Sequence, residues 1–321
     1  SLKLCNYYLN KFAKNKDLQD KIEFDLLFTC ATFANKKSMF KKLKNNFSKK
    51  DVNKIYKSLA QINSNLIINF NEDVKKLDEL TFRQNSVNKS NLYYLDKIYF
   101  LIEDCKKFGT LPFAGLARCG FVAIEILNSL VEENFITIDE KNKFLHNTST
   151  IMNQIKQDLK NDTKYKFLKK YGHLRPNTYE ITSKNYRENF DVYFKYLNKN
   201  EINVDNKKRS GLKYLKKPNV KDIGFNCSLK KFEQFIRDAI IYREYSKFLF
   251  TKNIDLTFEN LIAFGKKYKI RRSDLSYIKI SKILNMHFNI GNFDMIANLK
   301  FNINKNKNEY ENNKNISLPD V

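Results

Sequence analysis

The chain has 321 residues, 42% of them hydrophobic, with a formal net charge of +24 and a pI near 9.6. This length and the abundance of Phe and Tyr exclude a disordered chain and predict a sizeable core in one large or two medium domains. No run approaches the roughly 18 apolar residues that a membrane helix needs, and the first residues do not form a signal peptide. We therefore expect no membrane partner.

The first portion of the chain, residues 1–90, opens on a polar pattern that is typical of a helix. The stretch IEFDLLFTCATF, Ile22–Phe33, follows. Its aromatic residues and Thr suit either a short β element or a buried helix, and the pattern does not separate the two. Helices are expected over residues 38–80.

The second portion, residues 91–200, contains GTLPFAGLARCGFVAIEILNSLVEEN. Its Gly and Pro residues between Gly109 and Gly120 predict a turn, and the apolar residues that follow recur at the spacing of a buried helix. Another helix is expected from Thr148 to Lys169. Gly172 follows it at the position of a glycine that ends a helix.

The third portion, residues 201–305, starts with a Lys- and Asn-rich stretch that predicts an exposed loop. Ser228 is a suitable N-cap for a long helix that we expect to run through Phe250. Two shorter helices are expected next, one ending near Gly265 and one starting after Ser273.

Residues 306–321 are polar and predict an uncompact linker toward a domain that this chain does not contain. Low Gly and Pro content, with long mixed apolar and charged stretches, predicts a mainly α-helical fold. The one alternative to helix is the short β element near residues 22–33. No dinucleotide-binding glycine motif, P-loop or HExxH sequence occurs.

The cysteines are scattered and odd in number, and none belongs to a CxxC pair. This pattern indicates neither a zinc site nor a disulfide framework, so we expect reduced thiols, a cytoplasmic protein and no bound metal. The five cysteines are Cys5, Cys30, Cys105, Cys119 and Cys227.

The positive charge comes mostly from lysine, because only nine of the 59 basic residues are Arg, which leaves 50 Lys. Such a charge is typical of nucleic-acid binding, but Lys, Asn and Ile enrichment is also what an AT-rich genome produces. Arg is the better bidentate partner of phosphates and bases, and it is scarce here. The second interpretation is therefore favoured, and a basic helical module that binds nucleic acid or a phosphoprotein remains the alternative.

The segment KYGHLRPNTYEI, Lys170–Ile181, gathers residue types that are rare elsewhere in the chain. His173 and Arg175 are two residues apart in an extended stretch, so they point to the same side. Arg175 could bind an anion and His173 could carry a proton, with Tyr179 and Glu180 close by. The alternative is a structural loop, in which His173 bonds a backbone carbonyl and Arg175 pairs with Glu180.

Two further places offer cations to a ligand. Arg118 follows the Gly/Pro stretch at the expected start of an apolar helix, where anions are attracted, although a surface Arg would look the same. In FIRDAIIYREYSKFLFTK, Arg243, Lys247 and Thr251 continue an apolar helix face toward a possible cavity. The alternative there is that the cations are simply solvated.

Three stretches together resemble a known family. KYGHLRPNTYEITSKNYREN is similar to a segment of the phosphoenolpyruvate-synthase-like dikinases in which a Gly-His-Arg-Pro-like core precedes an acidic residue. GTLPFAGLARCGFVAIEILNSLV and YREYSKFLFTKNIDLTFENLIAFGKKYKIRRSDLSYIKI also resemble members of this group. The similarity covers roughly residues 20–300 and is closest to the L-glutamine kinases of capsule biosynthesis.

The resemblance implies a three-domain phosphotransferase. An ATP-grasp domain uses ATP and Mg to phosphorylate a mobile histidine domain, which carries the phosphoryl group to an acceptor-binding domain. The products are L-glutamine phosphate, AMP and phosphate. None of His146, His173 or His287 lies in the Gly- and Ser/Thr-rich loop of the family's phosphocarrier histidine, and the Gly-rich ATP-grasp loops are absent. The chain thus resembles the middle, acceptor-binding domain, which we expect to be inactive alone.

Within this resemblance, each candidate residue takes an expected role. Arg118 or Arg175 would hold the α-carboxylate of the acceptor, and Glu180 would bind its ammonium group or orient His173. Arg243 and Lys247 would stabilise phosphoryl charge, and His173 would move a proton. Tyr179 and Thr251 are expected to line the same substrate site. L-glutamine is the expected acceptor, and another small molecule is the alternative.

Overall fold

The computed structural model describes residues 30–45, 47–196, 211–288, 295–314 and 316, together with Lys3, Tyr7, Asn10, Lys11 and Lys14. These residues form helices and connecting segments without a strand, which confirms the mainly α-helical fold. Most of Ile22–Phe33, the stretch that could form a β element, lies outside the described residues. Its last four residues, Cys30–Phe33, form a bend and the start of a turn.

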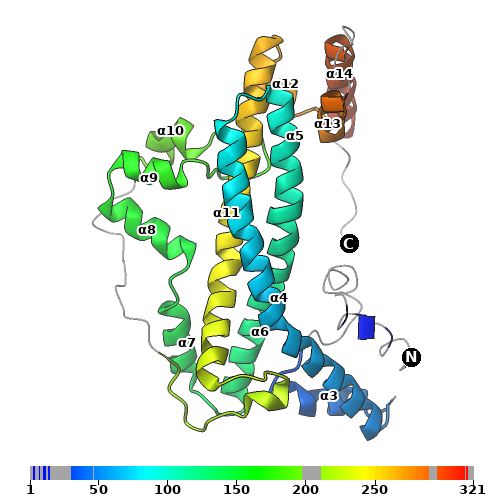
Figure 1. Ribbon diagram of the computed structural model, residues 1–321, viewed down its shortest axis with the longest axis vertical. Coiled ribbons are helices and arrows are strands. Elements are labelled where there is room, and N and C mark those ends of the chain that lie inside the picture. Colours follow the sequence, from blue (N-terminus) through cyan, green and yellow to red (C-terminus); the bar gives the residue numbers. More distant parts are fainter. Residues whose placement is uncertain are drawn as a thin grey trace. The chain divides into compact units, whose positions relative to one another are not determined.

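The chain divides into two compact units. Unit 1 consists of residues 1–78, 110–160 and 200–247, and unit 2 of residues 79–109, 161–199 and 248–321. Two long helices, α4 (Lys49–Lys89) and α11 (Leu229–Lys267), contribute residues to both units (Figure 1). The three consecutive portions expected from the sequence are therefore interleaved in space.

Unit 1 contains α3 (Asn35–Leu43), α6 (Leu111–Glu132), α7 (Ile138–His146), nearly all of α8 (Ile151–Asn161) and the 3-10 turn η5 (Val220–Ile223), besides its parts of α4 and α11. The amide of Asn63 ties two loops to α4, because its Nδ2 donates to the carbonyls of Ala31 at 2.8 Å and Ile223 at 2.7 Å. Gly224 follows with φ +93°, and a Cβ there would lie 2.0 Å from the Ala60 carbonyl oxygen. Only glycine fits this contact.

Unit 2 contains α5 (Tyr94–Asp104), most of the π-helical turn η3 (Cys105–Thr110), α9 (Lys164–Tyr171), α10 (Tyr186–Tyr193), α12 (Arg272–Leu275), α13 (Ile280–Phe288) and α14 (Met295–Asn313). Helix α13 lies beside α5 (Figure 1). A cluster of buried apolar side chains from α5, α11, α13 and α14 forms the core, and it includes Ile98, Phe264, Ile283, Met286 and Leu299.

The prediction of a turn between Gly109 and Gly120 is wrong, because η3 and α6 follow one another without a break and make this stretch helical. Pro112 is compatible with this course, since it occupies the first turn of α6, where no backbone donor is needed. The glycines instead let side chains from other helices come close to the backbone of α6. A Cβ on Gly115 would lie 2.2 Å from Oδ2 of Asp73, and one on Gly120 would lie 3.0 Å from Cδ of Arg243.

The single helix expected from Thr148 to Lys169 is interrupted, because α8 ends at Asn161 and α9 starts at Lys164. The hydroxyl of Thr163 accepts the backbone N–H of Lys166 and caps the second helix. Gly172 does follow the end of α9, but with φ −58°, so it is not the left-handed glycine that the pattern suggested. A Cβ there would lie 2.3 Å from the Leu168 carbonyl oxygen.

Helix α11 starts where the sequence predicts, with the Ser228 hydroxyl accepting the backbone N–H of Lys231 at 3.4 Å. It does not end near Phe250 but continues to Lys267, so the two shorter helices expected next are partly wrong. At the other end of the chain, α14 extends to Asn313, and the first residues of the expected linker are therefore helical. The role of residues 306–321 as a linker stays a prediction.

Among the residues that the structure describes, one helical stretch, Tyr94–Glu132, is long and apolar enough to cross a membrane by length and composition, which was not expected from the sequence. More than half of its most apolar window is buried inside the protein. Burial of this kind is what a core helix requires, so the stretch is weak evidence for a membrane segment.

Candidate functional site

The segment that carries the resemblance connects α9 to α10 in unit 2. It is fixed at its far end by a capping box, in which the Asn185 side chain accepts the Glu188 N–H and the Glu188 carboxylate accepts the Asn185 N–H. Backbone bonds fold it back on itself, because the N–H groups of Tyr186 and Arg187 donate to the carbonyls of Leu174 and Gly172. The segment is therefore a structured loop.

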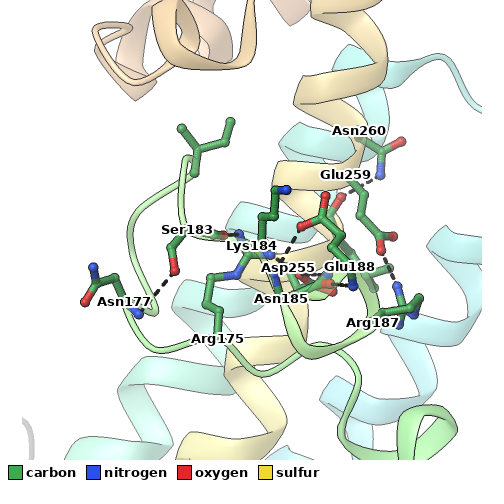
Figure 2. Close-up of polar contacts among 12 residues, drawn as sticks. Arg175, Asn177, Ser183, Lys184, Asn185, Arg187, Glu188, Asp255, Glu259 and Asn260 are labelled. Carbon is green, nitrogen blue, oxygen red and sulfur yellow. Dashed lines mark hydrogen bonds and ion pairs between the residues drawn. The ribbon is translucent and has the colours of Figure 1, made fainter. Parts of the chain in front are cut away.

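Arg175 is almost completely buried, with 3% of its side chain exposed. Its Nη2 forms an ion pair with the Asp255 carboxylate of α11, and its Nη1 donates to the Ser183 carbonyl at 3.0 Å (Figure 2). The guanidinium lies 5.0 Å from the ring centre of Phe258. These contacts fix the fork of Arg175 within the protein, and Glu180 is not its partner.

Asp255 receives a second hydrogen bond from Nδ2 of Asn185 at 3.0 Å. Burial nevertheless raises the pKa of Asp255 above its ordinary value, although these hydrogen bonds and the charge of Arg175 work in the opposite direction. A buried ion pair contributes little net stability, because the loss of hydration cancels most of the attraction. The intact pair is therefore expected to add little net stability, whereas removal of one partner would leave a buried, unpaired charge.

His173 is buried and donates from Nε2 to the Phe248 carbonyl at 3.1 Å. Because a carbonyl only accepts, this bond places the proton on Nε2 and leaves Nδ1 as the acceptor nitrogen of the neutral ring. Burial lowers the pKa of His173 to about 4, the bond to Phe248 opposes the change, and the charges of Lys252, Arg187 and Arg175 add to it. The imidazole is consequently neutral near pH 7.

Arg272 ties the N-terminus of α12 to the loop and to α10. Its guanidinium meets both carboxylate oxygens of Glu188, at 2.6 and 3.1 Å, and donates to the carbonyls of Ile181 at 2.6 Å and Ser183 at 3.2 Å. Partial burial works to raise the pKa of Glu188, but the hydrogen bonds from Arg272 and from the Asn185 backbone hold it below its ordinary value. Glu188 is thus a fixed anion at neutral pH.

A more accessible ion pair joins α10 to α11 at the edge of this network. Arg187 and Glu259 point toward one another (Figure 2), with 52% and 42% of their side chains exposed. Burial and the charge of Asp255, one turn earlier on α11, raise the pKa of Glu259 despite the bond to Arg187. We call the side chains of Arg175, Asn185, Glu188, Asp255 and Arg272, together with this pair, the α10–α11 network.

Of the other candidates in unit 2, Thr251 is buried and donates to the Phe248 carbonyl at 2.9 Å, the same oxygen that His173 uses. Tyr179 is exposed over 69% of its surface. Glu180 accepts the N–H and hydroxyl of Thr182 at 3.0 and 2.8 Å. The structure therefore brings His173 and Thr251 to one carbonyl, whereas among the described residues neither Tyr179 nor Glu180 is hydrogen-bonded to Arg175 or His173.

The remaining candidates belong to unit 1. Arg118 is buried, but it is the eighth residue of α6 rather than its first, so the helix N-terminus argument for an anion site there is wrong. Arg243 and Lys247 are exposed on α11, as in the alternative that leaves them solvated. The guanidinium of Arg243 lies 4.5 Å from the ring centre of Phe121, and the methylene groups of the Arg243 side chain pack against Gly120.

Sequence reasoning missed six members of the network, which are Asn185, Arg187, Glu188, Asp255, Glu259 and Arg272. One available signal was the scarcity of Arg, since three of the nine arginines in the chain occur in it. A second was the spacing of Asp255 and Glu259, which puts both carboxylates on one face of a helix.

Over the described residues, no group of three or more His, Cys, Asp and Glu side chains is placed to hold a metal ion. Comparison of the whole chain with models of protein families finds no match. Searches of curated proteins and of solved structures also find none. The physical chemistry of the network and the resemblance of its loop are thus what bears on function.

Proposed function

We propose that the chain is the acceptor-binding domain of an ATP-dependent kinase that works through a phosphohistidine, with L-glutamine as the acceptor. The observation that carries the proposal is the coincidence of two independent features. One of the three stretches that carry the family resemblance contains the loop where a buried His, two carboxylates of raised pKa and one of lowered pKa gather around three arginines. Titratable groups whose pKa values are shifted tend to cluster at functional sites.

The chemistry of amide phosphorylation fits a site of this kind. The acceptor must be held in line with the phosphoryl donor, its own charges must be matched, and an uncharged group must be ready to take up a proton. The neutral His173 imidazole is the proposed acceptor, because its Nδ1 carries a lone pair, although its lowered pKa makes it a weaker base than a free imidazole. Arg175 acts in this proposal as a positioning residue, since its donors are already bonded to Asp255 and Ser183.

ATP, Mg and the phosphohistidine belong to other domains of the proposed enzyme, and the chain alone is proposed to bind the acceptor without turning it over. A thermal-shift screen of the chain against the common amino acids, each with and without inorganic phosphate, tests this function. The proposal predicts a saturable rise of the unfolding midpoint with L-glutamine. A selective rise with a different small molecule would retain the binding role and replace the acceptor, and no rise with any of them would contradict the proposal.

The formal charge of +24 favours a second candidate, a basic helical module that binds nucleic acid or a phosphoprotein. Such binding weakens steeply as salt is added, because phosphate contacts release counterions. Titration of a fluorescent duplex at two salt concentrations separates the candidates. A steep salt slope with submicromolar binding would support the second candidate and contradict the first.

A further inference from the structure

The pair of Arg187 and Glu259 differs from the rest of the α10–α11 network in its accessibility. Only 3% and 2% of the Arg175 and Asp255 side chains are exposed, whereas about half of each side chain is exposed in the pair of Arg187 and Glu259. The two partners also come from different elements, since Arg187 lies in the first turn of α10 and Glu259 lies on α11. A ligand can therefore reach both groups and enter between them without unfolding either helix.

The charges around the pair are arranged as a dipole. On the side of Arg187, the cations of Lys252 and Arg175 join it in lowering the pKa of His173, so negative charge is favoured there. On the other side, burial and then the charge of Asp255 raise the pKa of Glu259, while the charges of Arg187 and Arg175 oppose the change. Arg175 is already paired with Asp255 and Arg187 with Glu259, and a further cation beside Glu259 would favour the charged form of its carboxyl.

Positive and negative ends side by side match a zwitterion. The backbone of a free α-amino acid carries a carboxylate and an ammonium group on one carbon, at the separation of neighbouring side chains in an ion pair. The planar fork of Arg suits the carboxylate, and a carboxylate accepts the N–H bonds of the ammonium. Exposed ion pairs contribute little stability, so separating this one for a ligand costs little.

We propose that Arg187 binds the α-carboxylate and Glu259 the α-ammonium of a free α-amino acid. This assignment rests on the proposed function and names the residues that recognise the common part of its acceptor. The Nε of Arg187 lies 3.3 Å from the position of a Cβ on Gly172. Gly172 thus leaves room for the guanidinium beside the loop, and a larger residue there would displace it.

The test uses calorimetric titration of the chain with L-glutamine and with two analogues. Glutaramate lacks the α-ammonium group, and 4-aminobutanamide lacks the α-carboxylate. R187Q is expected to weaken L-glutamine and glutaramate binding by about 10- to 100-fold and to leave 4-aminobutanamide unchanged. E259Q is expected to weaken L-glutamine and 4-aminobutanamide similarly and to spare glutaramate.

A matched control is available in unit 2, where Lys164 and Asp191 form an exposed ion pair at 2.6 Å. K164Q is expected to bind all three ligands as the unaltered chain does. L-glutamine binding that is unchanged in R187Q and E259Q would overturn the assignment while leaving the proposed function intact. An unaltered chain that binds no amino acid would overturn both, and an equal loss for all three ligands in R187Q would overturn the carboxylate assignment.

Discussion

Removal of the Asp255 carboxylate should be among the most damaging single changes in unit 2. In Asp255→Ala, the Arg175 side chain would stay buried, with 3% of it exposed, but would lose the carboxylate that pairs with it, and Asn185 would lose an acceptor. Breaking a buried pair from one side typically costs about 3–5 kcal/mol, because the remaining charge stays desolvated. We expect a loss of this size in the free energy of unfolding, measured with urea by far-UV circular dichroism at pH 7.

The double variant Arg175→Met/Asp255→Ala separates the effect of the charge from that of packing. It removes both charges, so it should recover most of the loss, since apolar replacement of a buried pair is often neutral. Lys164→Gln, which breaks an exposed pair, should change stability by less than about 1 kcal/mol. A loss below about 1 kcal/mol in Asp255→Ala, or a double variant as unstable as the single one, would refute the reasoning.

Three further predictions follow from individual contacts. Burial lowers the pKa of His173 from 6.5 to about 4, so the unfolded chain takes up a proton at a higher pH than the folded chain does. The free energy of unfolding, measured by urea titration, should therefore be at its full value above pH 6.5 and fall by about 3 kcal/mol toward pH 4. His173→Gln should largely remove this decline. Glu188→Ala should cost about 1–2 kcal/mol by removing the capping box and the bond to Arg272, whereas Glu188→Gln, which can still cap, should cost less. Gly224→Ala should lower the free energy of unfolding by about 1–3 kcal/mol, because the positive φ is strained for Ala and the added Cβ would meet the Ala60 carbonyl. In Gly211→Ala the added Cβ would meet only the end of the Glu233 side chain, at 3.0 Å, so the change should stay within about 1 kcal/mol. Equal losses in the two variants would contradict the role of backbone conformation.

The helical character of the chain could be predicted because it depends on local pattern, and the Ser228 cap placed the start of α11 correctly. The errors arose where a local signal had a tertiary cause. Gly115 and Gly120 suggest a turn by their type, but they are small because Asp73 and Arg243 approach α6. Gly265 likewise lies inside α11, where a Cβ would come within 3.0 Å of Ile270 and Leu275. Such contacts join residues far apart in the sequence, which periodicity does not register.

The candidate site was predictable only in part, because some of its residues are close in the sequence and others are brought together by the fold. The loop from His173 to Glu180 stood out by composition, and the bond from His173 to a backbone carbonyl was one of the two stated alternatives. The partner of Arg175 was not predictable, because Asp255 lies 80 residues away on another element. Glu180, the nearer carboxylate, bonds Thr182 instead. Sequence proximity was therefore a poor guide to charge pairing.

The central claim is that this chain binds a free amino acid, and isothermal titration of L-glutamine at two salt concentrations tests it most directly. The account predicts a saturable heat with one ligand per chain and an affinity that changes little with salt, since a zwitterion carries no net charge. No heat with L-glutamine, combined with tight duplex binding that weakens steeply as salt rises, would contradict the account and favour a nucleic-acid-binding module.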